Sequence, residues 1–241
     1  MLKVFWNSGP YIATMIFIVG MFWRYKFDRY GWTSRSSQIY ESRLLRIGSP
    51  FFHVGLLMAL GGHFMGLVIP ASYTEEVGIN DHTYHIVAVT LGSIAGVMVV
   101  SGMAILIYRR RTVLRVFQVT TKMDKLMYLV LGSLVTLGIY NTIGINLLNL
   151  PGKYPDGYNY RETVAVWFRS IAVFNPRTDL MESAPLTFQL HVLTSMVLIA
   201  IIPITRLVHI FSAPLGYISR PYLVYRKRGK NKVPRGWEPT R

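Results

Sequence analysis

Long apolar segments alternate with polar connections along most of the chain. Five such segments lie near residues 10–26, 50–70, 84–108, 125–148 and 186–211. Each approaches the roughly 20 residues that an α-helix needs to cross a hydrocarbon core of about 30 Å. A helix satisfies its own backbone hydrogen bonds, and these runs are too long for the alternating strands of a membrane barrel. The pattern therefore predicts an all-α integral membrane bundle of five transmembrane helices.

The composition supports a membrane location. Hydrophobic residues make up 51% of the chain and charged residues only 15%, which is too apolar for an ordinary soluble domain. The formal net charge is +15, but the basic residues lie between apolar segments, so they indicate contacts with anionic membrane lipid and not with nucleic acid. The chain contains no cysteine, which excludes iron–sulfur clusters ligated by this chain, thiolate zinc sites and covalent haem attachment.

Lysine and arginine are unevenly distributed among the connections. The connections on one side of the membrane contain 21 of them, and those on the other side contain 5. The 21 lie after the first segment, after the third segment and from Arg206 onward. Because basic connections stay in the cytoplasm, we expect a multi-pass protein of the cell (plasma) membrane with its N-terminus outside and its C-terminus cytoplasmic. We divide the chain into a transmembrane domain, 1–225, and a basic tail, 226–241. The tail either binds lipid headgroups or docks a cytoplasmic partner.

The longest outer connection, residues 149–185, contains a stretch with a possible helical pattern. Its large apolar residues recur at helical spacing: Val164, Trp167, Phe168, Ile171 and Phe174. Two interpretations stay open, namely a short helix that lies at the membrane interface and a plain ordered loop.

Four histidines lie inside segments that enter the lipid, two on the second segment and two on the fifth. A polar, metal-binding side chain costs free energy there, so a functional site is the default interpretation. The second segment runs outward and the fifth runs inward. His53 and His209 therefore lie near the cytoplasmic side, and His63 and His191 lie nearer the outside. Two facing histidines at matched depth can hold a haem iron, and two such pairs would form an electron path across the membrane.

The spacing of the four histidines leaves a mismatch. Ten residues separate His53 from His63, about 15 Å of helix, whereas eighteen residues separate His191 from His209, about 27 Å. Helix tilt and a kink at Pro203 can absorb part of the difference. The second segment also contains four glycines that either make room for a macrocycle or allow close helix packing: Gly55, Gly61, Gly62 and Gly66.

A ligating imidazole usually donates its second N–H to an oxygen that fixes its orientation. Four residues precede the histidines by one helical turn and offer a hydroxyl or a carbonyl for this purpose: Ser49, Ala59, Thr187 and Thr205. Arg206 lies one turn before His209. Its guanidinium either pairs with the propionates of an inner haem or extends to the cytoplasmic interface.

Two other interpretations of the histidines stay open at this point. A single histidine in a membrane helix can simply hydrogen-bond a neighbouring helix. The chain can also be a histidine-lined metal-ion transporter, although such sites often recruit carboxylates or thiolates. The interiors of the predicted spans contain no Asp or Glu.

The segments FFHVGLLMALGGHFMG, FQLHV and PITRLVHIFSAP resemble the haem b membrane subunit, or gamma subunit, of respiratory nitrate reductase, over about residues 10–225. The resemblance implies two haem b groups, an inner one on His53 and His209 and an outer one on His63 and His191. It further implies that quinol, expected to be menaquinol, is oxidised near the outer face. Electrons then pass to an iron–sulfur subunit and a molybdenum subunit that reduces nitrate. A dihaem anchor of another quinol-linked reductase is the alternative.

The sequence departs from the family at one expected quinol-binding position. Better-known members carry a lysine at the start of the third span, whereas no lysine occurs between residues 71 and 108. Tyr84 and His85 occupy this region, and we predict that His85 or Tyr84 contacts the quinol oxygen, with Gly62 and His63 beside it. An imidazole can accept a proton near neutral pH. His82 and His85 are equally typical of ordinary interfacial residues.

Overall fold

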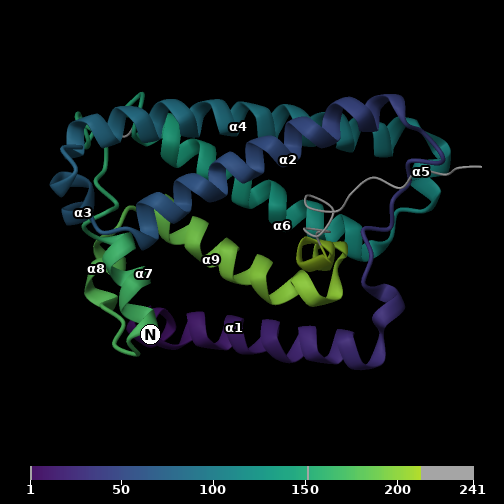
Figure 1. Cartoon of the computed structure of the whole chain (residues 1–241), viewed down its shortest axis with the longest axis horizontal. Helices are drawn as coiled ribbons and strands as arrows, with labels where there is room; N and C mark the ends of the chain where they lie inside the picture. Colours follow the sequence, from purple (N-terminus) through teal and green to yellow (C-terminus); the bar gives the residue numbers. More distant parts are fainter. Residues whose placement is uncertain (1, 151, 213–241) are drawn as a thin grey trace, which may run out of the picture.

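The structure is a computed structural model that describes residues 2–150 and 152–212. This part of the chain is helical and contains no strand. The long helices lie lengthwise in the molecule, with short helices near its two ends (Figure 1). The prediction of an all-α bundle with five spans is therefore confirmed. The helical stretches that are long and apolar enough to cross a membrane are Lys3–Phe27, Arg43–Val68, Asp81–Thr112, Lys122–Ile145 and Leu186–Ile204.

The helices follow one another in a simple order. The long ones are α1 (Leu2–Phe27), α2 (Arg43–His63), α4 (Asp81–Thr112), α6 (Lys122–Ile139) and α9 (Leu186–Ile201). The short ones are α3 (Ala71–Glu76), α5 (Leu114–Gln118), α7 (Val164–Ala172) and α8 (Thr178–Ser183). Two long helices continue as π-helical turns, α2 through Phe64–Val68 and α6 through Tyr140–Ile145. Side chains cap two N-termini, because Asn80 accepts from Thr83 N at α4 and Thr121 accepts from Asp124 N at α6.

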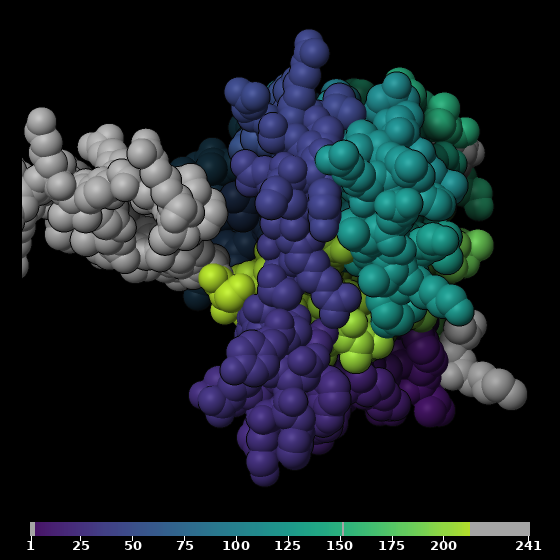
Figure 2. All heavy atoms as spheres, turned by 90° about the vertical axis from the view of Figure 1, so that its right-hand side faces the viewer, coloured from purple at the N-terminus to yellow at the C-terminus, as the bar shows by residue number. Residues whose placement is uncertain are grey.

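The two ends of the bundle carry different connections. Helices α3, α7 and α8 lie at one end, and α5 lies at the other (Figure 1). We call these the outer end and the inner end, after the orientation predicted from charge, which itself stays a prediction. Figure 2 faces the inner end, where the α1–α2 connection crosses the centre beside the teal region of α4 to α6. The predicted domain boundary and the tail 226–241 lie outside the described residues.

Helix α2 packs closely along α4. A Cβ atom added at Gly55 would come within 2.8 Å of the Ala95 carbonyl oxygen and 2.9 Å of Val99 N, and one at Gly102 would meet the backbone of Phe52. The packing interpretation therefore holds for Gly55, because only glycine lets the two backbones approach so closely. Helix α9 packs mainly on α6 and α1, and its Leu198 also packs against the hydrophobic cluster that contains Phe52 of α2.

The predicted short helix of the outer connection is present as α7. Its Trp167 side chain is 2% exposed and lies edge-on to Trp6 of α1, with ring centroids 5.8 Å apart. Trp167 Nε1 donates a hydrogen bond to the Trp6 carbonyl oxygen over 3.3 Å. The prediction of a short helix is therefore confirmed, and one face of α7 is buried against the N-terminal part of α1, whereas its location at the membrane interface stays a prediction.

The fifth span is not a single helix. Helix α9 ends at Ile201, a 3-10 turn covers Ile202–Ile204, Thr205 is extended, and a second 3-10 segment covers Arg206–Ser212. The predicted kink at Pro203 is confirmed and is a complete break, because proline has no N–H to continue the helical ladder. Arg24 of α1 stabilises the break by donating from Nε to the Pro203 carbonyl oxygen over 2.8 Å. Within the segment predicted near residues 186–211, only Leu186–Ile201 is α-helix, and the rest of the described chain is 3-10 turns and the extended Thr205.

Candidate functional site: two facing histidine pairs

The structure brings the four membrane histidines together as two pairs. His63 and His191 lie toward the outer end, with ring centroids 6.0 Å apart and ring planes 15° apart. His53 and His209 lie toward the inner end, with centroids 6.3 Å apart and planes 70° apart. Each pair joins the second span to the fifth, as the depth of the histidines in the sequence indicates.

All four imidazoles direct Nδ1 at a backbone carbonyl oxygen. The acceptors are Ser49 at 2.8 Å from His53, Ala59 at 2.6 Å from His63, Leu134 at 3.1 Å from His191, and Arg206 at 2.6 Å from His209. A carbonyl oxygen can only accept, so we assign the proton to Nδ1 in each ring. Nε2 then keeps its lone pair, which is the tautomer of an imidazole that ligates a metal.

Two of the predicted hydrogen-bond partners are correct and two are not. Ser49 and Ala59 lie one turn before their histidines and accept as expected. The His191 ring bonds to α6 instead of Thr187. The His209 ring bonds to the carbonyl of Arg206 and not to Thr205, because the α-helix has already ended and a spacing of four no longer places two residues on one face.

The donor sets fit haem iron. Two metal–nitrogen bonds of about 2 Å, with roughly 1 Å from each nitrogen to its ring centre, place two ring centroids roughly 6 Å apart. The observed separations of 6.0 and 6.3 Å agree with this value. In the part of the chain that the structure describes, no three His, Asp or Glu side chains gather as a metal site. Two imidazoles per site suit an iron whose other four ligands come from a porphyrin.

The four glycines of the second span differ in how much free space surrounds them. A Cβ atom at Gly61 or Gly62 would meet nothing within 4 Å, whereas one at Gly66 would overlap the Tyr160 hydroxyl. Gly62 precedes His63 directly, and the His53 and His63 side chains are exposed in this structure. An exposed imidazole is costly in hydrocarbon, so a group that covers these rings would stabilise them.

Arg206 has a protein partner at the inner end. Its Nε and Nη2 atoms both lie 2.6 Å from the carboxylate oxygens of Asp124 at the start of α6. The side chains of Arg206 and Asp124 are 12% and 3% exposed, so the pair is nearly buried. The predicted contact between Arg206 and a haem propionate stays a prediction.

Tyr84 and His85 lie at the outer end, at the start of α4. The Tyr84 hydroxyl is 3.4 Å from the Tyr160 hydroxyl, and His85 Nε2 is 3.3 Å from the Asn146 carbonyl oxygen. Neither residue shares a hydrogen bond with His63 in the described part of the chain. Tyr160 connects the two regions instead, because its hydroxyl also lies against Gly66, close to His63 on the second span.

Sequence reasoning missed two arginines of the outer connection, which it counted only as charges. Arg161 is 4% exposed, donates to Thr74 Oγ1 over 3.0 Å, and lies 3.9 Å from the centre of the Tyr84 ring. Arg169 donates to the Leu67 carbonyl oxygen over 3.0 Å. Burial, with the neighbouring Tyr84, raises the pKa of the Tyr160 phenol well above its usual range, so this hydroxyl stays protonated.

Together, the fold and the site define a multi-pass helical membrane protein whose second and fifth spans face each other through two histidine pairs. The chain belongs to the nitrate reductase gamma subunit family, whose model matches residues 2–228. The resemblance seen in the sequence is thereby confirmed.

Relatives with curated names agree with this family. The chain is 42% identical over 226 residues to the nitrate reductase gamma chain of Bacillus subtilis, covering 94% of this chain and 98% of the relative. It is 31% identical over 225 residues to the respiratory nitrate reductase 2 gamma chain of Escherichia coli, with 93% and 96% covered. It is 53% identical over 226 residues to the nitrate reductase-like protein NarX of Mycobacterium tuberculosis, covering 94% of this chain but only 34% of that longer protein.

Proposed function

We propose that this chain is the dihaem cytochrome b subunit of a quinol-oxidising respiratory nitrate reductase in the cell membrane. The observation that carries the proposal is the pairing of the four histidines, with each Nδ1 on a carbonyl oxygen and each Nε2 without a hydrogen bond to any other residue that the structure describes. Membership of the nitrate reductase gamma subunit family supports the nitrate reductase assignment.

In this proposal, His53 and His209 hold the inner haem, and His63 and His191 hold the outer haem. The haems supply one-electron carriers that link the two faces of the membrane. The carbonyl acceptors on Nδ1 keep each imidazole neutral, correctly oriented and more basic at Nε2. Gly62 leaves a bare backbone beside His63, where a side chain would otherwise occupy the open space.

We place quinol oxidation at the outer end, beside His63, Tyr84 and His85. Oxidation of a quinol releases two protons with two electrons, so the site needs a group that accepts protons. His85 is such a group, and its location at the start of α4 gives access to the outer connection. The Tyr84 hydroxyl can hydrogen-bond a quinol oxygen, and the guanidinium of Arg161 over its ring holds the phenol in place.

Electrons leave this chain at the inner end in our proposal. There they pass to an iron–sulfur subunit and then to a molybdenum subunit that reduces nitrate, with menaquinol as the expected electron donor. The names of the Bacillus subtilis and Escherichia coli relatives support a gamma chain that works with other subunits. The length of the Mycobacterium tuberculosis relative indicates that such a chain can also be part of a larger polypeptide.

The proposal is tested on the purified full-length protein. We expect a red protein with a reducible b-type absorbance, two haems per chain, and reduction of both haems by a menaquinol analogue. Mass spectrometry of the co-purifying subunits identifies the terminal reductase. A colourless protein with stoichiometric zinc would overturn the haem assignment and favour an ion transporter.

The quinol site is tested by the double variant Tyr84→Phe/His85→Gln. Loss of a hydrogen-bonding hydroxyl and of a proton acceptor should lower quinol oxidation roughly 100-fold while leaving both haems bound. The matched control is Tyr73→Phe/His82→Gln, because these residues are exposed near the same outer end. Equal quinol oxidation rates in the two double variants would show that Tyr84 and His85 do not form the site, whatever the haem content.

A further inference from the structure

The segment that carries His209 is not held by the hydrogen bonds of α9. The α-helix ends at Ile201, and His209 lies eight residues further, beyond the extended residue Thr205. A residue on a continuous helix is positioned by the helix itself, as His53 and His63 are on α2. The position of His209 must therefore depend on other contacts of the Arg206–Ser212 segment.

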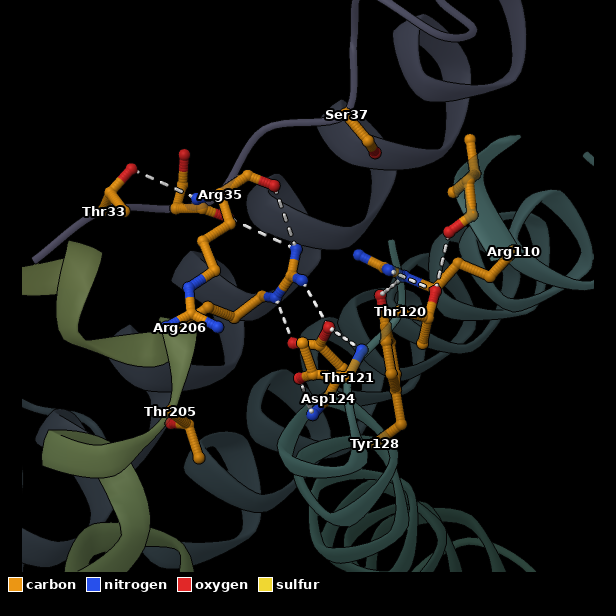
Figure 3. Close-up of polar contacts among 12 residues, drawn as sticks. Thr33, Arg35, Ser37, Arg110, Thr120, Thr121, Asp124, Tyr128, Thr205 and Arg206 are labelled. Atoms are coloured by element: carbon orange, nitrogen blue, oxygen red, sulfur yellow. Dashed lines mark hydrogen bonds and ion pairs between the residues drawn. The ribbon is translucent and has the colours of Figure 1, made fainter. Parts of the chain in front are cut away.

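The strongest polar contact of this segment is the pair between Arg206 and Asp124 (Figure 3). The guanidinium binds the carboxylate through two parallel hydrogen bonds of 2.6 Å, the geometry that fixes an arginine most firmly. Its remaining nitrogen, Nη1, lies 3.3 Å from the Ser34 carbonyl oxygen and 3.4 Å from that of Arg35. The side chain of Arg206 is thus held by α6 and by the α1–α2 connection together.

The carboxylate of Asp124 is also held in place by hydrogen bonds at the start of α6, independently of Arg206. Its carboxylate accepts from Thr121 N over 2.9 Å, and its own N–H donates to Thr121 Oγ1 over 3.2 Å. These two bonds form a capping box at the first turn of α6, so the carboxylate is anchored to the helix end. A buried carboxylate that is held in this way defines where the guanidinium must lie.

The backbone of Arg206 completes the connection to the histidine. Its carbonyl oxygen accepts from His209 Nδ1 over 2.6 Å, while its side chain is bound to Asp124. One residue thus joins the cap of α6 to the imidazole.

The same helix also orients the other histidine of the fifth span. The Leu134 carbonyl oxygen of α6 accepts from His191 Nδ1 over 3.1 Å. Asp124 and Leu134 are ten residues apart on α6, which is about 15 Å, and His53 and His63 have the same separation on α2. Helix α6 contributes no histidine of its own, yet its two contact points repeat the spacing of the ligands on α2.

From these contacts, we propose that α6 positions both histidines of the fifth span, and that Asp124 is the positioning residue for His209, acting through Arg206. The inference rests on the proposed function, because His209 is taken as a ligand of the inner haem. It explains how ten residues on α2 and eighteen on the fifth span serve the same two sites. The two histidines of the broken span are positioned by contacts with α6. These contacts lie ten residues apart on a continuous helix, as do His53 and His63 on α2.

The test uses the complete complex with the substitution Asp124→Asn. Asparagine keeps the size of the side chain and one oxygen acceptor, but it loses the charge and the second strong hydrogen bond to Arg206. We expect a shifted electron paramagnetic resonance signal and a shifted reduction potential for the inner haem, with roughly tenfold weaker retention of that haem. The signal, potential and retention of the outer haem should stay unchanged. The single variants His53→Ala and His63→Ala assign the two signals.

Two further variants keep the result interpretable. Arg206→Lys retains the charge and the main-chain acceptor but loses the two-pronged contact, so it should shift the same signal in the same direction. Asp179→Asn breaks an exposed ion pair near the outer end and should shift neither haem. Unchanged inner-haem properties in Asp124→Asn would overturn the inference, and so would equal losses of both haems. A wild-type complex whose membrane subunit contains no b-type haem would overturn the proposed function first.

Discussion

The outer and inner histidine pairs use the same two side chains but are built in different ways. His63 and His191 both stand on regular helix, their rings are nearly parallel, and short helices cover this end of the bundle. His53 stands on regular helix, but His209 stands on a short 3-10 segment after a break, and the two rings are tilted by 70°. The outer pair is positioned by continuous helices, whereas the inner pair depends on ion pairs and loop contacts.

This difference shows that two sites with the same pair of ligands can still differ in the groups that surround the ligands. Haem properties depend on hydrogen bonding to the ligands and on nearby charge as well as on the ligands themselves. Arg206 contacts the inner pair and is itself paired with Asp124, whereas the outer end of the bundle carries the buried Arg161 over the Tyr84 ring. Two haems bound at these pairs should therefore have different reduction potentials.

The largest expected effect comes from removing one histidine of α2 at a time. His63→Ala should lose the outer haem and stop the entry of electrons from quinol. His53→Ala should lose the inner haem but keep an outer haem that quinol still reduces. Haem content and the visible spectrum after addition of a menaquinol analogue measure both outcomes. If both variants behaved alike, the two pairs would not have separate roles.

A smaller effect, confined to the inner pair, is expected from Pro203→Ala. Alanine restores an N–H and removes the ring that packs beside Gly20, so the end of α9 can extend and move His209. We expect weaker retention of the inner haem and unchanged retention of the outer haem, measured as haem content after chromatography. The control is Pro10→Ala in α1, which should change neither. A loss confined to the outer haem would contradict the comparison.

The smallest effect concerns the anchoring of the inner end at Glu41. Burial favours the neutral carboxyl, but hydrogen bonds from Leu44 N–H and Arg109 outweigh it and hold the pKa of Glu41 below its ordinary 4.5. A lowered folded-state pKa gives stability that is present above the ordinary pKa and lost as pH falls through the folded value. Glu41 should therefore contribute about 1 kcal/mol or less near neutral pH and nothing in strong acid.

This contribution is measured as the difference in thermal unfolding between the wild type and Glu41→Gln in detergent. The difference should be greatest at neutral pH and should shrink once pH falls below 4.5. A difference that stayed constant through this range would show that the charge of Glu41 adds nothing. As the protein is destabilised at low pH, the absorbance of the inner haem should change before that of the outer haem.

The sequence was sufficient for the spans, the pairing of the histidines and a kink at Pro203. These depend on local patterns, namely apolar length, residue type at a known rise, and the missing N–H of proline. It was not sufficient for the contacts that orient His191 and His209. The acceptor on Leu134 is a backbone oxygen, which no residue type reveals, and Asp124 meets Arg206 across 82 positions of the chain.

The outer connection shows the same limit. Arg161 and Tyr160 look like ordinary polar residues of a loop, and only the folded structure shows that Arg161 is buried and lies over the Tyr84 ring. Charge counting assigns Arg161 to a side of the membrane and says nothing of its neighbours. The missing lysine drew attention to the start of α4, but not to the residues that surround it.

The close packing of α2 against α4 has a consequence for the order in which the parts of the protein assemble. These two helices form a compact hairpin through Gly55 and Gly102, and both leave the ribosome well before α9. Each histidine pair has one member on this early hairpin and one on the fifth span. The outer pair cannot form until translation has passed residue 191, and the inner pair cannot form until it has passed residue 209. We therefore expect haem to be inserted after the fifth span is made and to join it to the early hairpin.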